Sequence, residues 1–253
     1  MHFVFDLDGT ICFDGFTIEA SIKEALEQAS DFGHELLFAS ARSYRDCIDV
    51  LGESLSQNMV IGLNGGVVYD KGKLYTYHRL DKSVFQATVD FCQYHHIPYF
   101  VDDDFNYASH RAHKIPFIKS VDPLSLATML DITQLHHPIK MVLYLGEHEE
   151  LLPLLVDELK KAGIANISYH ENEKCLYLNP DGITKASTLS QIIGNQFVAF
   201  GNDKNDIDMF KLAQYSVQIG NYHLLKDYAD EQVKDIETIP EKILTLFETY
   251  QNF

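Results

Sequence analysis

The sequence predicts an α/β protein in which a doubly wound parallel sheet is interrupted by a second, inserted α/β module. Two observations lead to this prediction. Short apolar runs of strand length alternate with amphipathic helical stretches near both ends of the chain, which is typical of βαβ units. Between residues 81 and 180 the order changes, and pairs of short strands replace the regular alternation.

The amino-terminal part of the sheet is expected from three apolar runs, at Phe3–Phe5, Leu36–Ala39 and Val60–Leu63. Apolar residues recur at helical spacing between the first two runs, and Gly33 is well placed to end that helix. The segment Val67–Tyr77 contains turn residues at its centre and predicts a hairpin that extends the sheet. Two later runs, Phe197–Phe200 and Val217–Ile219, predict further parallel strands.

The inserted module is expected to contain its own helices and strands. In order they are a helix over 84–91, strands around Tyr99 and Tyr107, a helix near 124–130, a strand over 139–145, a helix over 152–159, and strands near Ile167 and 176–178. We therefore divide the chain into a core, residues 1–80 and 181–253, and an inserted cap, residues 81–180.

The charge balance excludes several classes of partner. The chain has 20 Lys and Arg residues against 37 Asp and Glu residues, a net charge of −17 without a basic patch, so we expect neither nucleic acid nor membrane binding. No apolar stretch reaches the length of a membrane span, and the amino terminus does not resemble a cleavable leader. Four scattered cysteines suit a reducing compartment. We expect a cytoplasmic monomer or homodimer.

Polar residues directly follow the apolar runs. In open α/β sheets ligands bind beyond the carboxyl ends of the strands, so these residues are candidates for a site. They are Asp6, Ser40, Asn64 and the triplet Gly201-Asn202-Asp203. The sequence thus predicts that carboxylates, a hydroxyl and amides meet at one edge of the sheet.

Asp6 and Asp8 form the most informative pair. On an extended chain, residues two apart point to the same side, and Gly9 lets the backbone turn afterwards. Two neighbouring carboxylates repel each other unless a cation or a shared proton intervenes. The pair therefore indicates a hard metal ion or nucleophile-plus-acid chemistry, and the alternative is an acidic turn without chemistry.

Taken together, the motifs resemble the haloacid dehalogenase (HAD) superfamily of phosphohydrolases, and more narrowly its Cof-type subfamily, type IIB. The motifs are Asp6-Leu7-Asp8-Gly9-Thr10, Phe38-Ala39-Ser40-Ala41-Arg42, Leu63-Asn64-Gly65-Gly66, Asp181-Gly182-Ile183-Thr184-Lys185 and the segment Gly201–Met209. That subfamily combines a Rossmann-like core with an α/β C2 cap between its second and third motifs. The inserted module of this chain lies at the corresponding place.

The resemblance implies a Mg²⁺-dependent phosphomonoesterase that acts on a small phosphorylated metabolite, such as a sugar phosphate or a phosphorylated cofactor. Asp6 would be the nucleophile and would carry an aspartyl-phosphate intermediate. Asp8 would protonate the leaving oxygen and then deprotonate the attacking water. Ser40 would bind the phosphoryl oxygens, and Lys185 would place a positive charge against Asp6 and the phosphate.

The resemblance also implies a set of binding residues. Substrate contacts would come from Ala41, Arg42, Asn64, Gly65 and Asn205. Metal ligands would come from Asp6, Asp8 through its backbone carbonyl, Asn202, Asp203 and Asp206.

One position departs from the family pattern. Asn202 stands where the family usually has Asp, so a neutral amide occupies the place of a charged metal ligand. Either Asn202 offers its amide oxygen, or Asp203 turns inward, with Asp206 acting through water. Two other functions stay open: a phosphomutase that uses the same nucleophile, and a sensor that binds sugar phosphates without turning them over.

Overall fold

The computed structural model describes residues 1–251 and divides the chain into two compact units. Unit 1 contains Met1–Tyr75 and the chain from Thr184 onward, and unit 2 contains Thr76–Ile183. These boundaries lie close to residues 80 and 181, where the sequence predicts the ends of the insertion. A mostly parallel core sheet and an inserted α/β module are both present, so the predicted fold class is confirmed.

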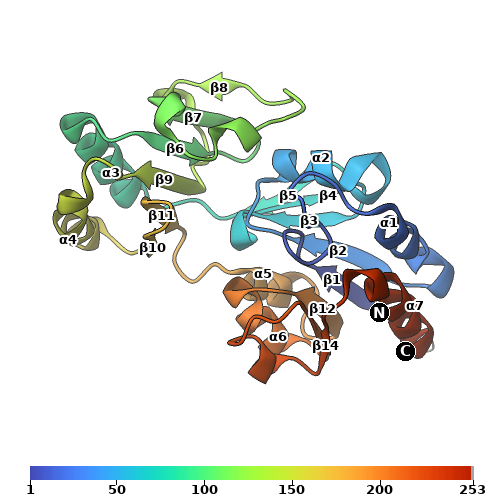
Figure 1. Ribbon diagram of the computed structural model, residues 1–253. Helices are drawn as coiled ribbons and strands as arrows, with labels where there is room; N and C mark the ends of the chain where they lie inside the picture. The colour runs from blue at the N-terminus through green and yellow to red at the C-terminus, as the bar shows by residue number, and fades with distance from the viewer. Residues whose placement is uncertain (252–253) are drawn as a thin grey trace. The chain divides into compact units, whose positions relative to one another are not determined.

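An eight-stranded sheet forms the centre of unit 1, in the order β14-β13-β12-β1-β2-β3-β4-β5 (Figure 1). Neighbouring strands are parallel from β14 to β3, and β4 returns antiparallel to β3. The bounds are β1 (His2–Phe5), β2 (Glu35–Ala39), β3 (Met59–Gly62), β4 (Val67–Asp70), β5 (Lys73–Tyr77), β12 (Phe197–Gly201), β13 (Tyr215–Ile219) and β14 (Glu231–Val233). The predicted hairpin is therefore β4 and β5.

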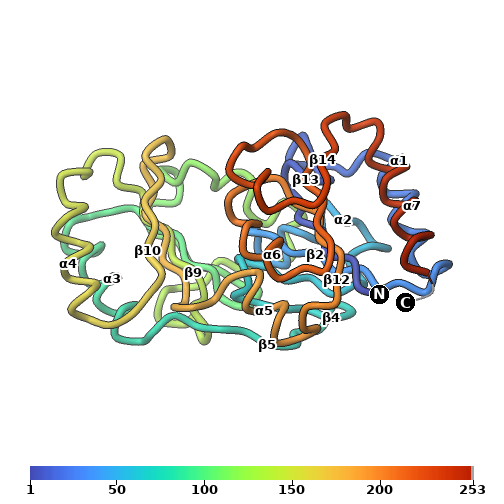
Figure 2. The backbone as a smooth tube through the Cα atoms, turned by 90° about the horizontal axis from the view of Figure 1, so that it is seen from below, coloured from blue at the N-terminus to red at the C-terminus, as the bar shows by residue number. Residues whose placement is uncertain are grey.

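Helices cover both faces of this sheet (Figure 2). They are α1 (Ala20–Glu27), α2 (Tyr44–Leu55), α5 (Lys185–Ile192), α6 (Ile207–Leu212) and α7 (Ile239–Tyr250). Consecutive side chains of a strand point to opposite faces. Phe3 of β1 meets Phe247 of α7 edge to face, with ring centroids 4.7 Å apart. Val4 instead belongs to a buried cluster with Leu189 of α5 and Met209 of α6. The core is thus doubly wound.

Unit 2 contains a six-stranded sheet in the order β10-β11-β9-β6-β7-β8. Its strands are β6 (Tyr99–Asp102), β7 (Tyr107–His110), β8 (Met129–Leu130), β9 (Lys140–Tyr144), β10 (Asn166–His170) and β11 (Cys175–Asn179). Two helices, α3 (Lys82–His95) and α4 (Leu152–Ala162), lie together on one side of it (Figure 1). Val84 of α3 and Leu155 of α4 share one buried cluster with Val101 and Leu143 of the sheet. This cluster is the core of unit 2.

The expectation of a helix near residues 124–130 is wrong. That segment is irregular apart from the two-residue strand β8. The Asp122 carboxylate accepts hydrogen bonds from the backbone N–H groups of Leu126 and Ala127, which ties the segment into a loop. Leu124 and Leu126 are exposed, so the apolar spacing that suggests a helix has no core to pack against.

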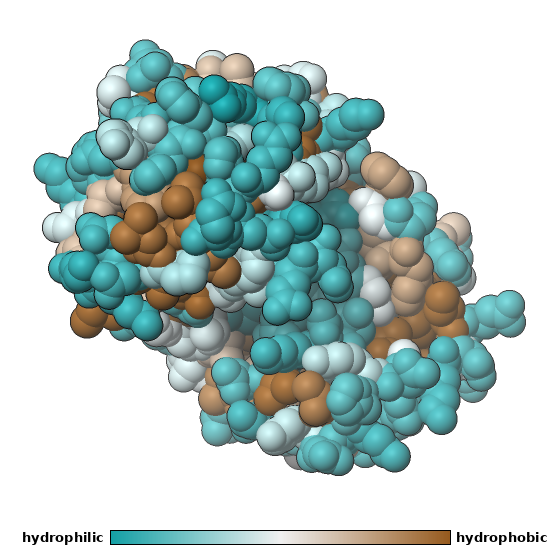
Figure 3. Space-filling view, turned by 60° about the vertical axis from the view of Figure 1, so that its left-hand side comes forward, coloured by the Kyte–Doolittle hydropathy of each residue, from teal (hydrophilic) through white to brown (hydrophobic). Residues whose placement is uncertain are grey.

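The visible surface is mostly hydrophilic (Figure 3). In the view of Figure 3 hydrophilic residues cover most of the molecule, and apolar residues form scattered patches. Among residues 1–251, none of the helices combines the length and the apolar character needed to cross a membrane.

His34 ties the carboxyl-terminal helix to the sheet. Its Nε2 lies 2.8 Å from the carbonyl oxygen of Phe247 in α7, and its ring packs 4.9 Å from that of Phe3. Burial lowers the pKa of His34, whereas the hydrogen bond to Phe247 opposes that change. Within residues 1–251 its Nδ1 has no hydrogen-bond partner, so a proton added there would be buried without an acceptor.

This environment predicts a loss of stability in acid. Because the pKa of His34 is lowered by folding, the unfolded chain binds the proton first, and the free energy of unfolding falls as the pH drops below about 6.5. One proton contributes at most about 1.4 kcal/mol per pH unit. Between pH 7.5 and pH 5.5, the midpoint of thermal unfolding should fall less in His34→Gln than in the parent protein. The exposed His223→Gln is the control, and an unchanged drop in His34→Gln would contradict the prediction.

Candidate active site

The carboxyl ends of the central strands lie level with one another. The last residue of β1, Phe5, is in register with Phe38 of β2 and with Phe200 of β12. The residues that follow these strands therefore come to the same edge of the sheet. Asp6 follows β1, and its backbone N–H donates to the carbonyl of Phe200 at 3.0 Å. Parallel pairing thus gathers segments that are far apart in sequence.

A buried lysine between two carboxylates forms the centre of this edge. Lys185 Nζ lies 2.5 Å from Asp6 Oδ1 and 2.8 Å from Asp206 Oδ1. All three side chains are almost completely buried. Lys185 is the first residue of α5, whose N-cap, Thr184, accepts a hydrogen bond from the backbone of Ser187. Two carboxylates and one ammonium leave one surplus negative charge inside the protein.

The surplus charge perturbs the titration of the cluster. Burial raises the pKa of Asp6 to about 7; Lys185 lowers it and Asp206 raises it further. Burial alone would lower the pKa of Lys185, but the attraction of Asp206 and Asp6 outweighs burial and raises it. Lys185 is therefore a permanent cation, and Asp6 is a carboxyl group whose charge depends on further neutralisation.

Asp206 also shapes the loop that follows β12. Its Oδ2 accepts hydrogen bonds from the backbone N–H groups of Asn202 at 2.9 Å and Asp203 at 3.2 Å. Gly201 makes this close approach possible, because a Cβ atom there would lie 2.7 Å from the Asp206 carboxyl carbon. One carboxylate thus fixes both Lys185 and the backbone of residues 202 and 203.

The side chain of Asn202 faces Asp6 through Thr10. Thr10 Oγ1 lies 3.2 Å from Asp6 Oδ2 and 3.3 Å from Asn202 Oδ1, so its single proton serves two acceptors. Gly9 has a left-handed backbone, and a Cβ atom there would collide with Nδ2 of Asn202. Thr10 is a residue of this site without a role predicted from the sequence. Its place in the Asp-Leu-Asp-Gly-Thr motif was the only signal that could have found it.

Asp203 and Asn205 lie outside this cluster. Both are exposed, and the Asp203 carboxylate accepts the backbone N–H of Lys204 at 2.6 Å. Asp203 thereby caps the short helix Lys204–Asp206. Of the two residues proposed for the place of the family's Asp, Asn202 thus contacts Thr10 of the cluster, whereas the Asp203 carboxylate binds a local backbone amide. Which of them would hold a metal ion stays a prediction. The Asp206 oxygens accept hydrogen bonds from Lys185 and from two backbone amides, and the expectation that Asp206 acts through water stays a prediction.

Asp8 does not point at the lysine cluster but pairs with Arg42. Arg42 Nε donates to Asp8 Oδ2 at 2.9 Å, and Arg42 Nη2 donates to Asp8 Oδ1 at 2.6 Å. The same Nη2 donates to the carbonyl of Gly15 at 2.7 Å. Ser40 is buried, and its hydroxyl accepts the backbone N–H of Arg42 at 3.1 Å; Ala41 lies half-buried between the two.

The Asn64-Gly65 turn supports the same edge. Asn64 adopts a left-handed conformation, and its backbone N–H donates to the carbonyl of Ser40 at 2.9 Å. Within residues 1–251 its buried Oδ1 has no hydrogen-bond partner. Gly65 packs directly on the backbone of Thr184, the residue before Lys185, where a Cβ atom would not fit. Residues of all five predicted motifs thus contact one another in unit 1.

The donor set suits Mg²⁺, although residues 1–251 hold no group of three or more His, Cys, Asp or Glu side chains arranged for a metal ion. Mg²⁺ commonly takes one or two carboxylates and completes its shell with waters and substrate phosphate. Asp6 offers a carboxylate with surplus negative charge beside it, and Asn202 offers a neutral oxygen. The residues therefore fit a magnesium ion with few charged ligands.

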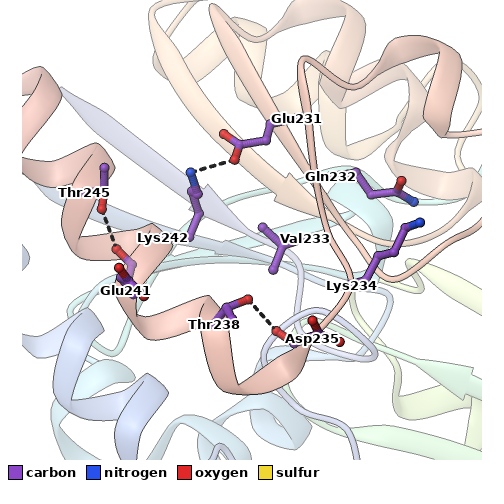
Figure 4. A pocket seen from close by; sticks show the side chains of 9 residues that line it. All are labelled: Glu231, Gln232, Val233, Lys234, Asp235, Thr238, Glu241, Lys242 and Thr245. Atoms are coloured by element: carbon purple, nitrogen blue, oxygen red, sulfur yellow. Dashed lines mark hydrogen bonds and ion pairs between the residues drawn. The ribbon is translucent and has the colours of Figure 1, made fainter.

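A separate pocket of about 400 Å³ lies between β14 and α7. Figure 4 shows its lining side chains, among them Lys242, whose Nζ lies 2.6 Å from a carboxylate oxygen of Glu231. It contains none of the predicted site residues. The candidate site is therefore the sheet edge at Asp6 and not this pocket.

Comparison with known proteins identifies the family. Residues 3–238 match the family model for haloacid dehalogenase-like hydrolases. The chain belongs to this family. The resemblance seen in the motifs is thus confirmed, and the chain is a HAD-like hydrolase.

Relatives and solved structures agree with this HAD assignment. The chain is 22% identical over 233 residues to the 5-amino-6-(5-phospho-D-ribitylamino)uracil phosphatase of Bacillus subtilis, covering 85% of each chain. A haloacid dehalogenase-like hydrolase from Bacteroides thetaiotaomicron is 21% identical, with a TM-score of 0.79 over 97% of this chain and 98% of that chain. A HAD subclass IIB sugar phosphatase is 20% identical, with a TM-score of 0.73 over 98% of both chains. The structural matches show a shared fold.

The close approach of Gly9 to Asn202 leads to a stability prediction. Gly9 and Gly33 both have left-handed backbones, but only at Gly9 would a Cβ atom meet another side chain. Gly33→Ala should cost about 1 kcal/mol of unfolding free energy from backbone strain alone. Gly9→Ala should lower the unfolding free energy clearly more than Gly33→Ala does. Adding Asn202→Ala to Gly9→Ala should remove this difference. Chemical denaturation of the parent, the two single variants and the double variant tests this, and equal losses at Gly9 and Gly33 would contradict it.

Proposed function

We propose that this HAD-like hydrolase is a Mg²⁺-dependent phosphomonoesterase that hydrolyses small phosphorylated metabolites through an aspartyl-phosphate on Asp6. The observation that carries the proposal is the Asp6 carboxylate, buried at the end of the central strand and held by Lys185 and Thr10. A carboxylate that attacks a phosphate ester needs a fixed position and neutralised charge more than it needs basicity. Lys185 fixes one oxygen of Asp6 and neutralises part of the charge.

In the first step an Asp6 oxygen attacks phosphorus, and the bond from phosphorus to the leaving oxygen breaks. A proton from Asp8 goes to the leaving oxygen, so the alcohol departs neutral. The Ser40 hydroxyl, at the end of β2, donates a hydrogen bond to a phosphoryl oxygen. Lys185 remains charged throughout and offsets the negative charge that gathers around Asp6.

In the second step water attacks phosphorus, and the bond from phosphorus to Asp6 breaks. Asp8 accepts a proton of that water. Inorganic phosphate is released, and the Asp6 carboxylate is restored. Asp6, the backbone carbonyl of Asp8 and Asn202 would hold the magnesium ion. When bound, Mg²⁺ neutralises phosphate charge and brings the anionic ester close to the Asp6 carboxylate.

We assign residues 81–180 the role of a cap that recognises the leaving group. Support for small phosphorylated substrates comes from the B. subtilis relative, whose name gives it a phosphorylated ribitylaminouracil as substrate. Phosphate release from sugar phosphates, nucleotides, pyridoxal phosphate and flavin mononucleotide tests the proposal. An isomeric phosphate without free phosphate would favour a phosphomutase.

The replacement of the family's Asp by Asn202 is the one observation that favours a binding sensor. Asn202 nevertheless lies beside Thr10 and Asp6, where its oxygen remains useful to a cation. Tight binding of a sugar phosphate with no phosphate release at any Mg²⁺ concentration would establish the sensor and refute hydrolysis.

Asp6→Asn tests the nucleophile. The amide is nearly the same size but cannot attack phosphorus, so phosphate release should fall by more than about 10⁴-fold. The fold should survive, because the change removes the surplus negative charge beside Lys185 and Asp206. Beryllium fluoride should form its adduct on Asp6 in the parent protein. The exposed Asp31→Asn is the control, and near-parent activity of folded Asp6→Asn would remove Asp6 from this role.

Asn202→Asp tests the departure from the family pattern. A third carboxylate near Asp6 and Asp206 should lower the melting temperature without metal and tighten Mg²⁺ binding on the order of tenfold, because hard cations respond to ligand charge. Calorimetric titration with Mg²⁺ and thermal melting measure the two effects. Asp203→Asn should change neither, since that carboxylate is exposed and caps a local helix. Weaker Mg²⁺ binding in Asp203→Asn, with no change in Asn202→Asp, would mean that residue 203 binds the metal.

A further inference from the structure

The pair formed by Asp8 and Arg42 uses one complete edge of the guanidinium. Nε and Nη2 form the edge of an arginine that binds a carboxylate or a phosphate with two parallel hydrogen bonds. Here that edge lies on the two oxygens of Asp8, and Nη2 also holds the carbonyl of Gly15. The resemblance to the family implies a substrate contact for Arg42, but its Nε–Nη2 edge is already engaged within the protein.

The backbone of Arg42 is fixed from both sides. Its N–H donates to Ser40 Oγ at 3.1 Å, and its carbonyl accepts the backbone N–H of Leu63 at 2.7 Å. The side chain is only 21% exposed, whereas that of Asp8 is 49% exposed. A half-exposed carboxylate on a turn has several rotamers available. Arg42 is thus the more buried partner with a backbone held on both sides, and its two N–H groups restrict the rotamers open to Asp8.

The two contacts also set the orientation of Asp8. Each of its oxygens accepts one N–H group of Arg42, so the plane of the carboxylate follows the plane of the guanidinium. A group that takes a proton from water must present an oxygen to that water, as the second step requires of Asp8.

We propose that Arg42 is a positioning residue for dephosphorylation: it orients the Asp8 carboxylate to accept the proton of the water that cleaves the aspartyl-phosphate. Arg42 acts through Asp8 and does not touch the phosphoryl group. This inference rests on the proposed phosphatase function and adds to it the step that Arg42 serves.

Steady-state and rapid-mixing kinetics with 4-nitrophenyl phosphate and Mg²⁺ test the inference. Nitrophenolate leaves without a proton, so the first step with this substrate does not need Asp8 as an acid. In Arg42→Gln, kcat should fall on the order of 10- to 100-fold while kcat/KM stays within about twofold, because only the step after the aspartyl-phosphate slows. KM should fall with kcat, and a burst of nitrophenolate should precede the slow steady state.

Two further variants separate charge from geometry. Arg42→Lys keeps the positive charge without the two-pronged geometry and should show an intermediate loss of kcat. Lys211→Gln removes a positive charge on α6 that pairs with Asp208, and it should match the parent. A parent-like kcat in Arg42→Gln would overturn the inference. A fall in kcat/KM as large as that in kcat would also overturn it, because it would show a substrate contact.

A double-mutant cycle tests whether Arg42 acts through Asp8. If Arg42 acts only through Asp8, Arg42→Gln should have no further effect on kcat in an Asp8→Asn background. An additional loss there would contradict the inference. Absence of nitrophenolate release by the parent would instead refute the phosphatase proposal itself, and the inference with it. Parent activity combined with the wrong pattern in Arg42→Gln would refute the inference alone.

Discussion

The arrangement of unit 1 depends on one buried ammonium group. Lys185 holds Asp6 at the end of β1 and Asp206 in the loop after β12, and both contacts are shielded from water. Removing Lys185 from this cluster would leave two buried carboxylates without compensation, which is strongly destabilising. The cluster therefore fixes how the amino-terminal strand, α5 and the loop 201–206 meet. Its surplus negative charge at the same time provides the attraction for a cation.

The family motifs are connected through backbone contacts as much as through side chains. Gly65 packs on Thr184, Gly201 on Asp206 and Gly9 on Asn202, and each contact excludes a Cβ atom. These glycines let polar side chains approach one another at hydrogen-bond distance. The functional edge is thus a packed structure whose geometry tolerates little variation.

Much of this edge could be predicted from the sequence. The apolar runs placed β1, β2, β3 and β12 correctly, and the polar residues after them meet because parallel strands end at one edge. The role of Thr10 could not be predicted, because it depends on the position of Asn202, 192 residues away. The orientation of Asp203 depends on local capping, and that of Asp8 on its pairing with Arg42. The local sequence does not show which partner Asp203 or Asp8 binds.

The position of β1 in the sheet has a consequence for how the chain is made. Its neighbours are β2, which follows within 40 residues of the amino terminus, and β12, which begins at Phe197. A ribosome therefore releases β1 to β5, and all of unit 2, before the second neighbour of β1 exists. Until then one side of a strand with three consecutive apolar residues presents unpaired backbone groups, a ready template for association with other chains. Unit 2, a contiguous segment with its own core, has no such delay. The nascent chain therefore carries a nearly complete inserted unit and a half-built sheet, and Asp6 directly follows the strand whose pairing is completed last.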